Sequence, residues 1–326
     1  MIISIAYHYI RPCFKQPYPG VFGLTPEEFA GQLKILSQYG EFISQERLQN
    51  ALYNNEELPE KGWLISFDDG LREQYEYALP ILDEMAIPAM FFVNTSPLAD
   101  KKILYVHMTH LLRSNVAPAE LVAHIYSIAD KNDITITEVD SLKAVKQYCY
   151  DNTEVAELKY LLNFSLSQKD RDFIIEKCFA SLLSWDNEEV SNSLYMSKAQ
   201  MKELASRGYL GAHTHSHRPL ATLNKETVQE EITKCVSYIE SWTGKTVDTL
   251  GYPYGSKIAC SVEVAQIASD LGVNMAFTME RAGIDDKTNP LLIPRCAPND
   301  LPGGNKPIWK VEDLFQEVPS SSWYQT

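Results

Sequence analysis

The stretch Trp63-Leu64-Ile65-Ser66-Phe67-Asp68-Asp69-Gly70 joins an apolar run to two carboxylates and a glycine. A short apolar run of this kind is typical of a buried strand, and glycine permits a tight turn where the strand ends. Active sites of βα barrels gather at such strand ends. Two adjacent carboxylates point in different directions, so one can bind a metal while the other stays free as a base. Taken alone, however, an Asp-Asp-Gly sequence is more often a solvated turn or a helix N-cap.

The sequence on both sides of this stretch alternates strand-like and helix-like patterns. We expect strands at residues 2–7, 63–67, 88–93, 247–251, 274–279 and 291–295, with a short one leading into residues 211–213. We expect helices at residues 26–37, 71–86, 198–206, 224–242 and 262–271. The first helix begins at Thr25-Pro26-Glu27-Glu28, which offers an N-cap, a proline at the first helical position and a glutamate at the third. This alternation predicts an α/β fold around a mainly parallel sheet or barrel.

The pattern changes between residues 101 and 190, where strand-like runs become rare. Several helix-length segments follow one another there, such as residues 154–164 and 171–185. We therefore expect residues 1–100 and 191–326 to form the barrel and residues 101–190 to form a helical insertion. An insertion between strand ends would lie beside the site, as a lid or a wall that selects substrates.

The composition excludes several classes of partner. The 326 residues include 29 basic and 43 acidic side chains, so the formal charge of −14 gives no general attraction to nucleic acid or anionic membranes. No run of about 18 apolar residues occurs, so no membrane span is expected. The opening sequence MIISIAYHYIRP has no basic leader, which predicts a cytoplasmic protein. The six cysteines are far apart and are expected to be separate core thiols in a reducing compartment: Cys13, Cys149, Cys178, Cys235, Cys260 and Cys296.

The densest chemical feature is the run His213-Thr214-His215-Ser216-His217, which places three of the seven histidines within five residues. Neutral imidazole is the commonest protein ligand for zinc and similar ions, so the run predicts a metal site. The alternative is a polar turn that is His-rich without a metal. In an extended strand all three rings would share one face, whereas at a strand end a subset such as His213 and His217 can converge.

Two histidines and one carboxylate make a three-ligand metal site with an open position for water. This is the catalytic form of a metal centre, and it predicts metal-assisted hydrolysis. The H-x-H pattern also occurs in amidohydrolases, which need further histidines on later strands. No histidine follows His217, so that interpretation fails.

The order and spacing of several short motifs resemble the polysaccharide deacetylase family, also called the NodB-homology or carbohydrate esterase family 4 group. The motifs are Phe67-Asp68-Asp69-Gly70, His213-Thr214-x-x-His217 and Tyr252-Pro253-Tyr254-Gly255, with the opening Tyr7-His8-Tyr9 and residues 22–29. The resemblance covers about residues 1–98 and 191–300. It implies a distorted (β/α) barrel of the NodB type that carries a helical insertion.

The resemblance also implies roles for individual residues. Asp68 would be the general base, and Asp69, His213 and His217 would hold the metal. The metal would polarise an acetamide carbonyl, and the backbone N–H of Tyr254 would stabilise the oxyanion. Tyr252, Pro253 and Arg295 are expected to bind substrate, although an ordinary surface role for Arg295 stays open.

Two departures from the family pattern bear on the mechanism. Gly251 stands where the family usually has an arginine that holds the catalytic aspartate, so the orientation of Asp68 must come from elsewhere. The family's late catalytic histidine is absent. His8 is the best placed of the candidate proton donors, although a histidine without a catalytic role is the more common case at any one such position. Other open assignments are His107 and His110 as donors, the direction of His215, and Trp185, Trp242 and Trp323 as core residues or sugar-stacking platforms.

The sequence thus predicts a metal-dependent hydrolase that removes an N-acetyl or N-formyl group from an amino sugar in a surface polysaccharide or glycan precursor. The ligand set favours zinc and also accepts cobalt, nickel or manganese. Two alternatives stay open: a sugar-binding relative without turnover, and a metal-independent amidase that acts on a non-sugar amide.

Overall fold

The computed structural model describes residues 1–18, 20–148, 151–310 and 312–324, which form two compact units. The first unit comprises Met1–Pro12, Gly23–Lys102 and Ser191–Thr326, and the second comprises Cys13–Phe22 and Ile103–Val190. The sequence division places residues 1–100 and 191–326 in the barrel and residues 101–190 in the insertion. It differs from the two units at residues 13–22, which group with the second unit, and at residues 101–102, which group with the first.

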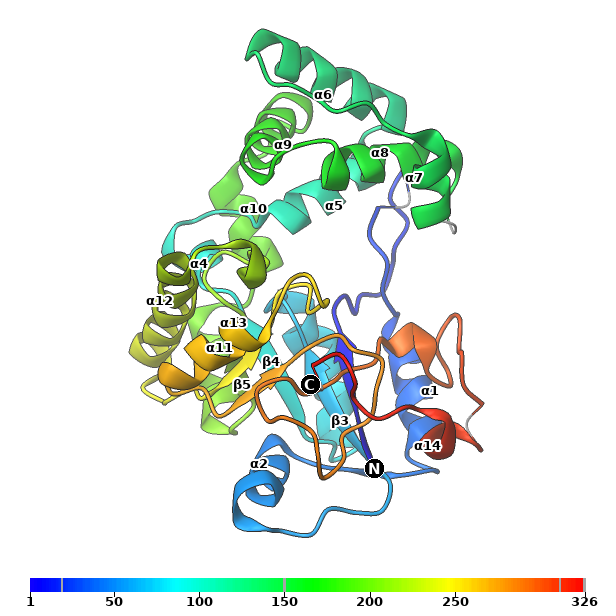
Figure 1. Ribbon diagram of the computed structural model, residues 1–326, viewed down its shortest axis with the longest axis vertical. Coiled ribbons are helices and arrows are strands. Elements are labelled where there is room, and N and C mark those ends of the chain that lie inside the picture. Colours follow the sequence, from blue (N-terminus) through cyan, green and yellow to red (C-terminus); the bar gives the residue numbers. More distant parts are fainter. Residues whose placement is uncertain (19, 149–150, 311, 325–326) are drawn as a thin grey trace. The chain divides into compact units, whose positions relative to one another are not determined.

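A curled parallel sheet forms the centre of the first unit (Figure 1). Its strands are β1 (Ile2–Tyr7), β2 (Glu41–Phe42), β3 (Gly62–Phe67), β4 (Ala89–Val93), β5 (Leu210–Ala212), β6 (Thr249–Gly251) and β7 (Met275–Phe277). The order is β1-β3-β4-β5-β6-β7, β2 pairs with the start of β3, and every pairing is parallel. The predicted parallel α/β sheet is confirmed, and all of its carboxyl ends meet at one edge.

The segment after β7 joins the two outer strands of this sheet. Ile293 forms a parallel bridge with Phe277 in β7, and Cys296 forms one with Ile5 in β1. The strand predicted at residues 291–295 was wrong, because the segment makes only these isolated bridges. Pro294 has no N–H to donate to a ladder, which limits regular pairing here.

Helices surround the sheet, and most begin at caps that the sequence supplies. They are α1 (Pro26–Leu36), α2 (Gln45–Asn54), α3 (Leu79–Glu84), α4 (Ser96–Ala99), α11 (Lys198–Ser206), α12 (Lys225–Thr243), α13 (Val262–Asp270) and α14 (Leu314–Glu317), with short 3-10 turns at Leu220–Thr222 and Pro298–Asp300. The predicted capping box of Thr25 and Glu28 is confirmed at α1. Helix α2 and strand β2 were not predicted.

The helix predicted at residues 71–86 contains a π-helical turn, Gln74–Ala78, before α3. The Leu79 N–H donates to the carbonyl of Gln74, five residues back. Pro80 follows and has no N–H to donate into this turn, which favours the wider turn over a regular α-helix.

Side chains of the strands are buried on both faces of the sheet. One face packs against the helices through Ile3, Ile5, Ile65 and Phe67. The opposite, inner face carries a separate cluster, which includes Ile2, Leu64, Met90, Phe92 and Phe277. Because side chains alternate along a strand, Ser66 and Asp68 continue the inner row begun by Leu64. The alternation therefore directs Asp68 into the mouth of the barrel.

The second unit is helical. Its helices are α5 (Tyr105–Asn115), α6 (Pro118–Lys131), α7 (Ser141–Gln147), α8 (Thr153–Phe164) and α9 (Gln168–Leu182), followed by α10 (Asn187–Leu194), which runs across the unit boundary at Ser191. Leu121, Ile125, Leu161, Ile174 and Cys178 are buried in this unit. The helices predicted at residues 154–164 and 171–185 correspond to α8 and α9.

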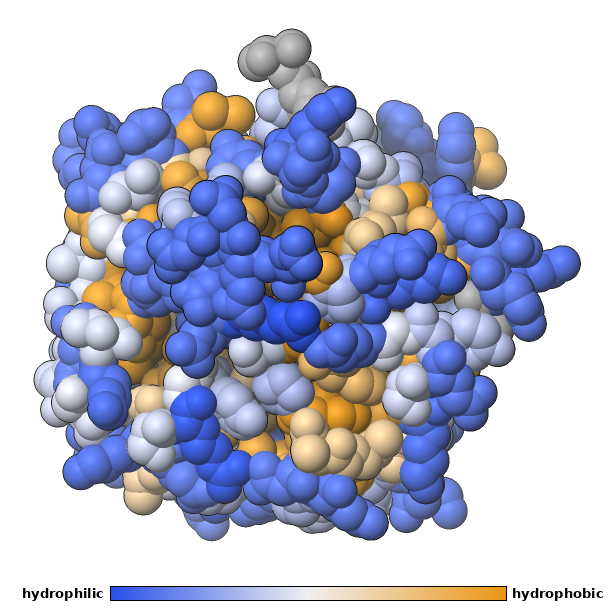
Figure 2. Space-filling view, turned by 90° about the horizontal axis from the view of Figure 1, so that it is seen from below, coloured by the Kyte–Doolittle hydropathy of each residue, from blue (hydrophilic) through white to orange (hydrophobic). Residues whose placement is uncertain are grey.

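The described cysteines are free thiols, and four of the five are buried. Cys13 is exposed, so the prediction that it is a core thiol was wrong; Cys149 lies outside the described residues. Figure 2 shows one face of the molecule, on which hydrophilic residues dominate and smaller hydrophobic areas appear between them. Among the residues described here, no helix is both long and apolar enough to cross a membrane.

Candidate active site

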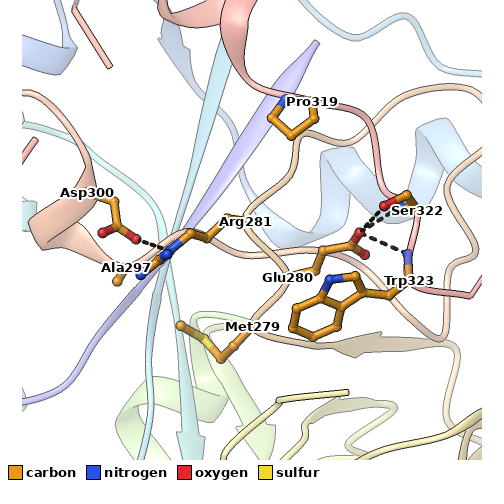
Figure 3. A pocket seen from close by; sticks show the side chains of 8 residues that line it. All are labelled: Met279, Glu280, Arg281, Ala297, Asp300, Pro319, Ser322 and Trp323. Atoms are coloured by element: carbon orange, nitrogen blue, oxygen red, sulfur yellow. Dashed lines mark hydrogen bonds and ion pairs between the residues drawn. The ribbon is translucent and has the colours of Figure 1, made fainter. Parts of the chain in front are cut away.

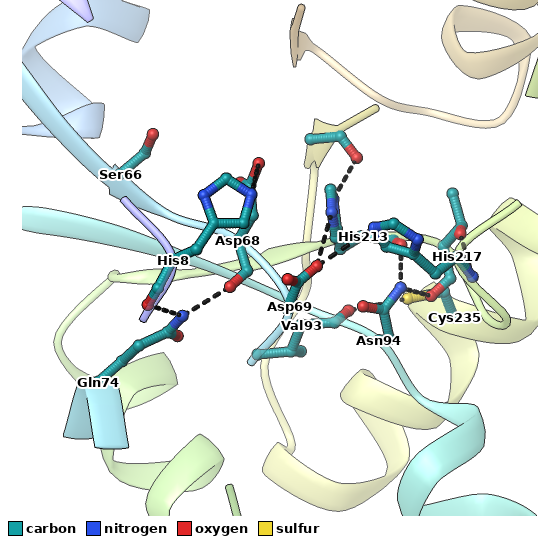
Figure 4. Close-up of polar contacts among 12 residues, drawn as sticks. His8, Ser66, Asp68, Asp69, Gln74, Val93, Asn94, His213, His217 and Cys235 are labelled. Carbon is teal, nitrogen blue, oxygen red and sulfur yellow. Dashed lines mark hydrogen bonds and ion pairs between the residues drawn. The ribbon is translucent and has the colours of Figure 1, made fainter. Parts of the chain in front are cut away.

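Three strand ends bring the predicted site residues together at the carboxyl edge of the sheet (Figure 4). Asp68 and Asp69 follow β3, His213 follows β5, and Tyr254 follows β6. The Asp68 N–H extends the ladder by donating to the Tyr7 carbonyl at 3.0 Å, so the backbone at Asp68 is fixed by the sheet itself.

Asp69, His213 and His217 form a buried cluster with one potential ligand atom each, all within 4.8 Å of one another. Asp69 Oδ1 lies 3.5 Å from His213 Nε2 and 3.2 Å from His217 Nε2. Two ligands that are each about 2.1 Å from one tetrahedral metal ion are about 3.4 Å from each other. The two measured separations are therefore those expected of ligands that share one metal ion. The donor set and its spacing therefore fit a divalent ion such as zinc.

The surroundings of His213 fix its orientation and favour a cation. Its Nδ1 lies 2.7 Å from the carbonyl oxygen of Gly251, and a proton on Nδ1 leaves Nε2 directed at Asp69. Burial by itself lowers the pKa of His213, but the carboxylates of Asp68 and Asp69 more than reverse this and raise it. The same negative charge attracts a metal ion.

Gly251 leaves no room for the arginine that the family usually has there. A Cβ at this position would lie 3.0 Å from His213 Nδ1 and 3.0 Å from the Phe92 ring. Any side chain would therefore crowd the histidine that the Gly251 carbonyl orients.

Left-handed backbone conformations gather in the site. Asp69, Thr214, His217 and Tyr254 have φ angles of 79°, 65°, 59° and 61°. Non-glycine residues rarely adopt this region, and such strain concentrates where a fold must aim particular side chains. The His217 N–H donates to Thr214 Oγ1 at 3.2 Å, which secures the turn between the two histidine positions.

Arg295 holds the carboxylate of Asp68. Nη1 donates to Oδ1 at 2.6 Å and Nη2 donates to Oδ2 at 2.8 Å, while the arginine side chain is 0% exposed. Burial alone would raise the pKa of Asp68, but Arg295, with His213 and His8, outweighs it and lowers that pKa. Asp68 is therefore ionised at neutral pH, as a general base must be.

Arg295 was predicted to bind substrate, and the structure places its side chain inside the barrel. Its Nε donates to the Thr278 carbonyl at 3.0 Å, and its Nη1 also donates to Ser66 Oγ at 3.2 Å. Its guanidinium lies over the Phe92 ring, with 5.4 Å between Cζ and the ring centroid. These contacts leave it inside the barrel. Ile293, two residues earlier in the same segment, also packs in the inner cluster.

His8 lies at the open side of Asp68. Its Nε2 is 3.9 Å from Asp68 Oδ2, and its side chain is 43% exposed. Gln74, which was not predicted, links the two loops: its Nε2 donates to the backbone carbonyls of Asp68 at 2.6 Å and His8 at 3.0 Å. Figure 4 shows Gln74 reaching both. Nothing in the sequence pattern distinguished this residue.

The Tyr252–Gly255 turn is divided between core and surface. Tyr252, which was predicted to bind substrate, is fully buried, and its hydroxyl donates to the Leu291 carbonyl at 3.0 Å. Pro253, for which the same role was predicted, is also buried. Tyr254 is 42% exposed, and its ring packs edge-on against His217 with centroids 4.8 Å apart.

The other three histidines considered as candidates separate into two groups. His215 faces neither Asp69 nor the other ligands, because Nδ1 is 2.9 Å from Thr95 Oγ1 and Nε2 is 3.1 Å from Asp100 Oδ2. His107 and His110 lie on α5 in the second unit, with ring centroids 6.1 Å apart.

The polysaccharide deacetylase family model matches residues 55–276, more than half of the chain. The chain belongs to the polysaccharide deacetylase family. A comparison with curated protein sequences gives no significant match. Family membership supports a carbohydrate de-N-acetylase, and the predicted family resemblance is confirmed.

Solved structures of deacetylases have the same fold. The deacetylase PplD of Streptococcus pyogenes, in complex with acetate, is 17% identical with a TM-score of 0.57, and the match covers 97% of each chain. IcaB from Ammonifex degensii is 17% identical with a TM-score of 0.56, over 93% of this chain and 94% of that one. The BpsB deacetylase domain from Bordetella bronchiseptica is 16% identical with a TM-score of 0.52, over 91% and 95%. The expected NodB-type barrel is confirmed.

Within this deacetylase fold, Arg295 holds Asp68, which an arginine at the position of Gly251 usually does in the family. The guanidinium that holds the aspartate comes from the segment that joins β7 to β1 rather than from the turn after β6. The polysaccharide deacetylase site of this chain therefore has an oriented carboxylate although the usual arginine position is a glycine.

Proposed function

We propose that this chain is a metal-dependent hydrolase that removes an N-acetyl or N-formyl group from an amino sugar in a surface polysaccharide or glycan precursor. The observation that carries the proposal is the buried Asp69–His213–His217 cluster beside an ionised Asp68. A metal-ligand set and a separate oriented base are the two components that amide hydrolysis at neutral pH requires.

Asp69, His213 and His217 would hold the metal, for which zinc is favoured by the histidines. The ion would supply Lewis-acid polarisation of the amide carbonyl. Asp68 Oδ2 takes a proton from the attacking water, since Arg295 keeps the carboxylate ionised and aimed. The backbone N–H of Tyr254 stabilises the charge that develops on the carbonyl oxygen.

The leaving amine needs a proton when the C–N bond breaks. His8 is proposed to donate it, because its ring is exposed at the mouth of the site with Nε2 3.9 Å from Asp68 Oδ2. The water contributes OH to the acyl carbon and its proton passes to Asp68. The products are acetate or formate and the free amino sugar.

The test combines metal content with acetate release. Wild-type protein should contain about one divalent ion per chain by mass spectrometry and release acetate from N-acetylated oligosaccharides. Asp68→Asn should keep the metal and lose hydrolysis, whereas His213→Ala should lose both.

His215→Gln is the matched control, because His215 lies in the same run but binds Thr95 and Asp100 instead of the cluster. It should keep the metal and the activity. Sugar binding without acetate release, or hydrolysis that persists after metal removal, would contradict the proposal in favour of a binding relative or a metal-independent amidase.

A further inference from the structure

The C-terminal segment, residues 319–324, is attached to the segment that follows β7 through the buried carboxylate of Glu280 (Figure 3). Two backbone N–H groups donate to its Oε1, that of Ser322 at 2.6 Å and that of Trp323 at 3.0 Å. The Ser321 hydroxyl donates to Oε2 at 2.7 Å. Breaking these bonds would leave a buried carboxylate without its partners, which is costly. One side chain therefore secures three consecutive residues of the C-terminal segment.

A second attachment joins the C-terminal segment to the loop after β6. The Tyr324 hydroxyl donates to the Cys260 carbonyl at 3.1 Å and lies 3.0 Å from Cys260 Sγ. Burial raises the pKa of the Cys260 thiol to about 11, so the thiol keeps its proton and can donate to the Gly255 carbonyl, 3.8 Å from Sγ. The C-terminal segment is therefore bonded to the loop that carries Tyr254 as well as to the segment after β7.

The two residues that precede the glutamate contact two parts of the candidate active site. The Thr278 carbonyl accepts a hydrogen bond from Arg295 Nε at 3.0 Å. The Met279 N–H donates to the Gly255 carbonyl at 2.8 Å. Gly255 follows Tyr254, whose N–H is the proposed oxyanion donor. Three consecutive residues thus contact the arginine that holds the proposed base, the turn of the oxyanion donor and the C-terminal segment.

The contact between Gly255 and Met279 is tight. Gly255 has a left-handed φ of 51°, and a Cβ at this position would lie 2.7 Å from the Met279 nitrogen. The segment after β7 therefore cannot move closer to the turn, and the hydrogen bond opposes movement away from it. Because protein interiors are closely packed, a displacement of Glu280 is passed on to Met279 and Thr278 rather than absorbed by empty space.

The candidate metal ligands are held by other contacts. The Gly251 carbonyl orients His213, and Thr214 Oγ1 accepts a hydrogen bond from the His217 N–H. Asp69 follows β3. A displacement of residues 278–280 should therefore disturb the base and the oxyanion donor without removing the metal.

We propose that Glu280 is a positioning residue for the hydrolytic reaction. By binding residues 321–323 it fixes Thr278 and Met279, and through them it fixes the Arg295 guanidinium and the Tyr254 N–H. The C-terminal segment then belongs to the structure that orients the reacting groups. The proposal rests on the proposed function, which assigns the base and the oxyanion donor.

Glu280→Ala removes both carboxylate oxygens and should lower kcat by about 10-fold, because displaced reacting groups lose their productive geometry. KM and metal content should change little. Glu280→Gln should restore most of kcat, since its amide oxygen can accept from the two N–H groups and its amide nitrogen can donate to the Ser321 hydroxyl. Rescue by an uncharged side chain separates positioning from a role of the negative charge. Steady-state kinetics and mass spectrometry of the bound metal provide the measurements.

Amide hydrogen exchange tests the same coupling without turnover. In Glu280→Ala the peptides that contain Ser322 and Met279 should both exchange faster than in wild type, and in Glu280→Gln both should stay protected. Tyr324→Phe keeps the ring and removes only the second attachment. It should lower kcat by a smaller factor with KM and metal content unchanged, and it tests the C-terminal segment even if Glu280→Ala does not fold.

Arg281→Ala is the matched control. Arg281 is the next residue along the chain, but its Nε donates to Asp300 Oδ2 at 2.7 Å instead of binding the C-terminal segment. The variant should leave kcat and the exchange of the Ser322 peptide unchanged.

An unchanged kcat in Glu280→Ala, or a Met279 peptide that stays protected while the Ser322 peptide exchanges faster, would overturn the proposal, because the attachment would then serve only the C-terminal segment. Loss of metal in parallel with kcat, or a Glu280→Gln variant as impaired as Glu280→Ala, would overturn it too. A failure of the wild-type protein to release acetate would contradict the proposed function instead, and the exchange data would still decide whether Glu280 fixes Met279.

Discussion

Arg295 and Asp68 form two hydrogen bonds, from Nη1 to Oδ1 at 2.6 Å and from Nη2 to Oδ2 at 2.8 Å, although 227 residues separate them in the chain. This fork geometry orients both carboxylate oxygens, which the point charge of a lysine cannot do. The candidate metal ligands Asp69, His213 and His217 are different residues, so the orientation of the proposed base and the proposed binding of metal can be separated experimentally.

Arg295→Lys should lower kcat by about 100-fold, because a misplaced base loses the near-attack geometry. KM and metal content should change little. Steady-state kinetics together with mass spectrometry of the bound metal provide the measurement. Arg207→Lys is the control, since Arg207 pairs with Asp83 on the surface. A loss of metal equal to the loss of kcat would contradict a positioning role for Arg295.

Gln74→Leu should lower kcat by about 10-fold with little change in KM, since it removes both bonds that tie the Asp68 and His8 loops together. Leucine fills a similar volume, so the loss should not come from a cavity. Gln266→Leu on the exposed face of α13 is the matched control. An equal effect on thermal stability in both variants, with unchanged kcat for Gln74→Leu, would exclude the proposed link.

The Asp69–His213–His217 cluster could be predicted from sequence because its placement follows from local rules. Asp69 and His213 each follow a short apolar strand, and parallel strands bring their carboxyl ends to one edge. His217 lies four residues further on, and the left-handed turns at Thr214 and His217 allow it to converge.

The errors arose where tertiary structure overrides a local pattern. The role of Arg295 depends on the segment between β7 and β1. This segment pairs irregularly at Pro294, and the apolar pattern of residues 291–295 did not show that. Tyr252 and Tyr254 lie in one turn, yet the ring of Tyr252 is buried and that of Tyr254 is exposed. The backbone at Tyr254 is left-handed, which the sequence pattern does not show. Gln74 lies in a π-helical turn, whereas the spacing of apolar residues alone predicts an ordinary α-helix there.

Gly251→Ala should weaken metal binding by about 10-fold, the usual effect of disturbing a group that orients a metal ligand. The new Cβ would lie 3.0 Å from His213 Nδ1 and displace the ring from the Gly251 carbonyl. Competition with a chelator measures the affinity. Gly208→Ala is the control for a glycine substitution with open space around the Cβ, and it should change stability without changing metal affinity. Unchanged metal affinity in Gly251→Ala would contradict the expected crowding.

Glu73 should make stability depend on pH. Burial raises the pKa of this carboxyl to about 7, although Arg11, whose Nη2 is 2.7 Å from Oε2, opposes the shift. Between about pH 4.5 and 7 the folded chain holds a proton that the unfolded chain has released, so the free energy of unfolding falls as pH rises through this window. The decrease is at most about 3 kcal/mol.

Glu73→Gln should remove this contribution, because glutamine resembles the protonated acid and does not titrate. Urea unfolding followed by tryptophan fluorescence at pH 5 and pH 7.5 should give a smaller difference in the variant than in wild type. Glu263→Gln, at an exposed carboxyl whose pKa is lowered by the Ser261 hydroxyl, should leave the decrease in place. An equal change in the free energy of unfolding of Glu73→Gln and wild type between the two pH values would contradict this prediction. The Glu73–Arg11 pair would then be ionised in the folded protein at both pH values.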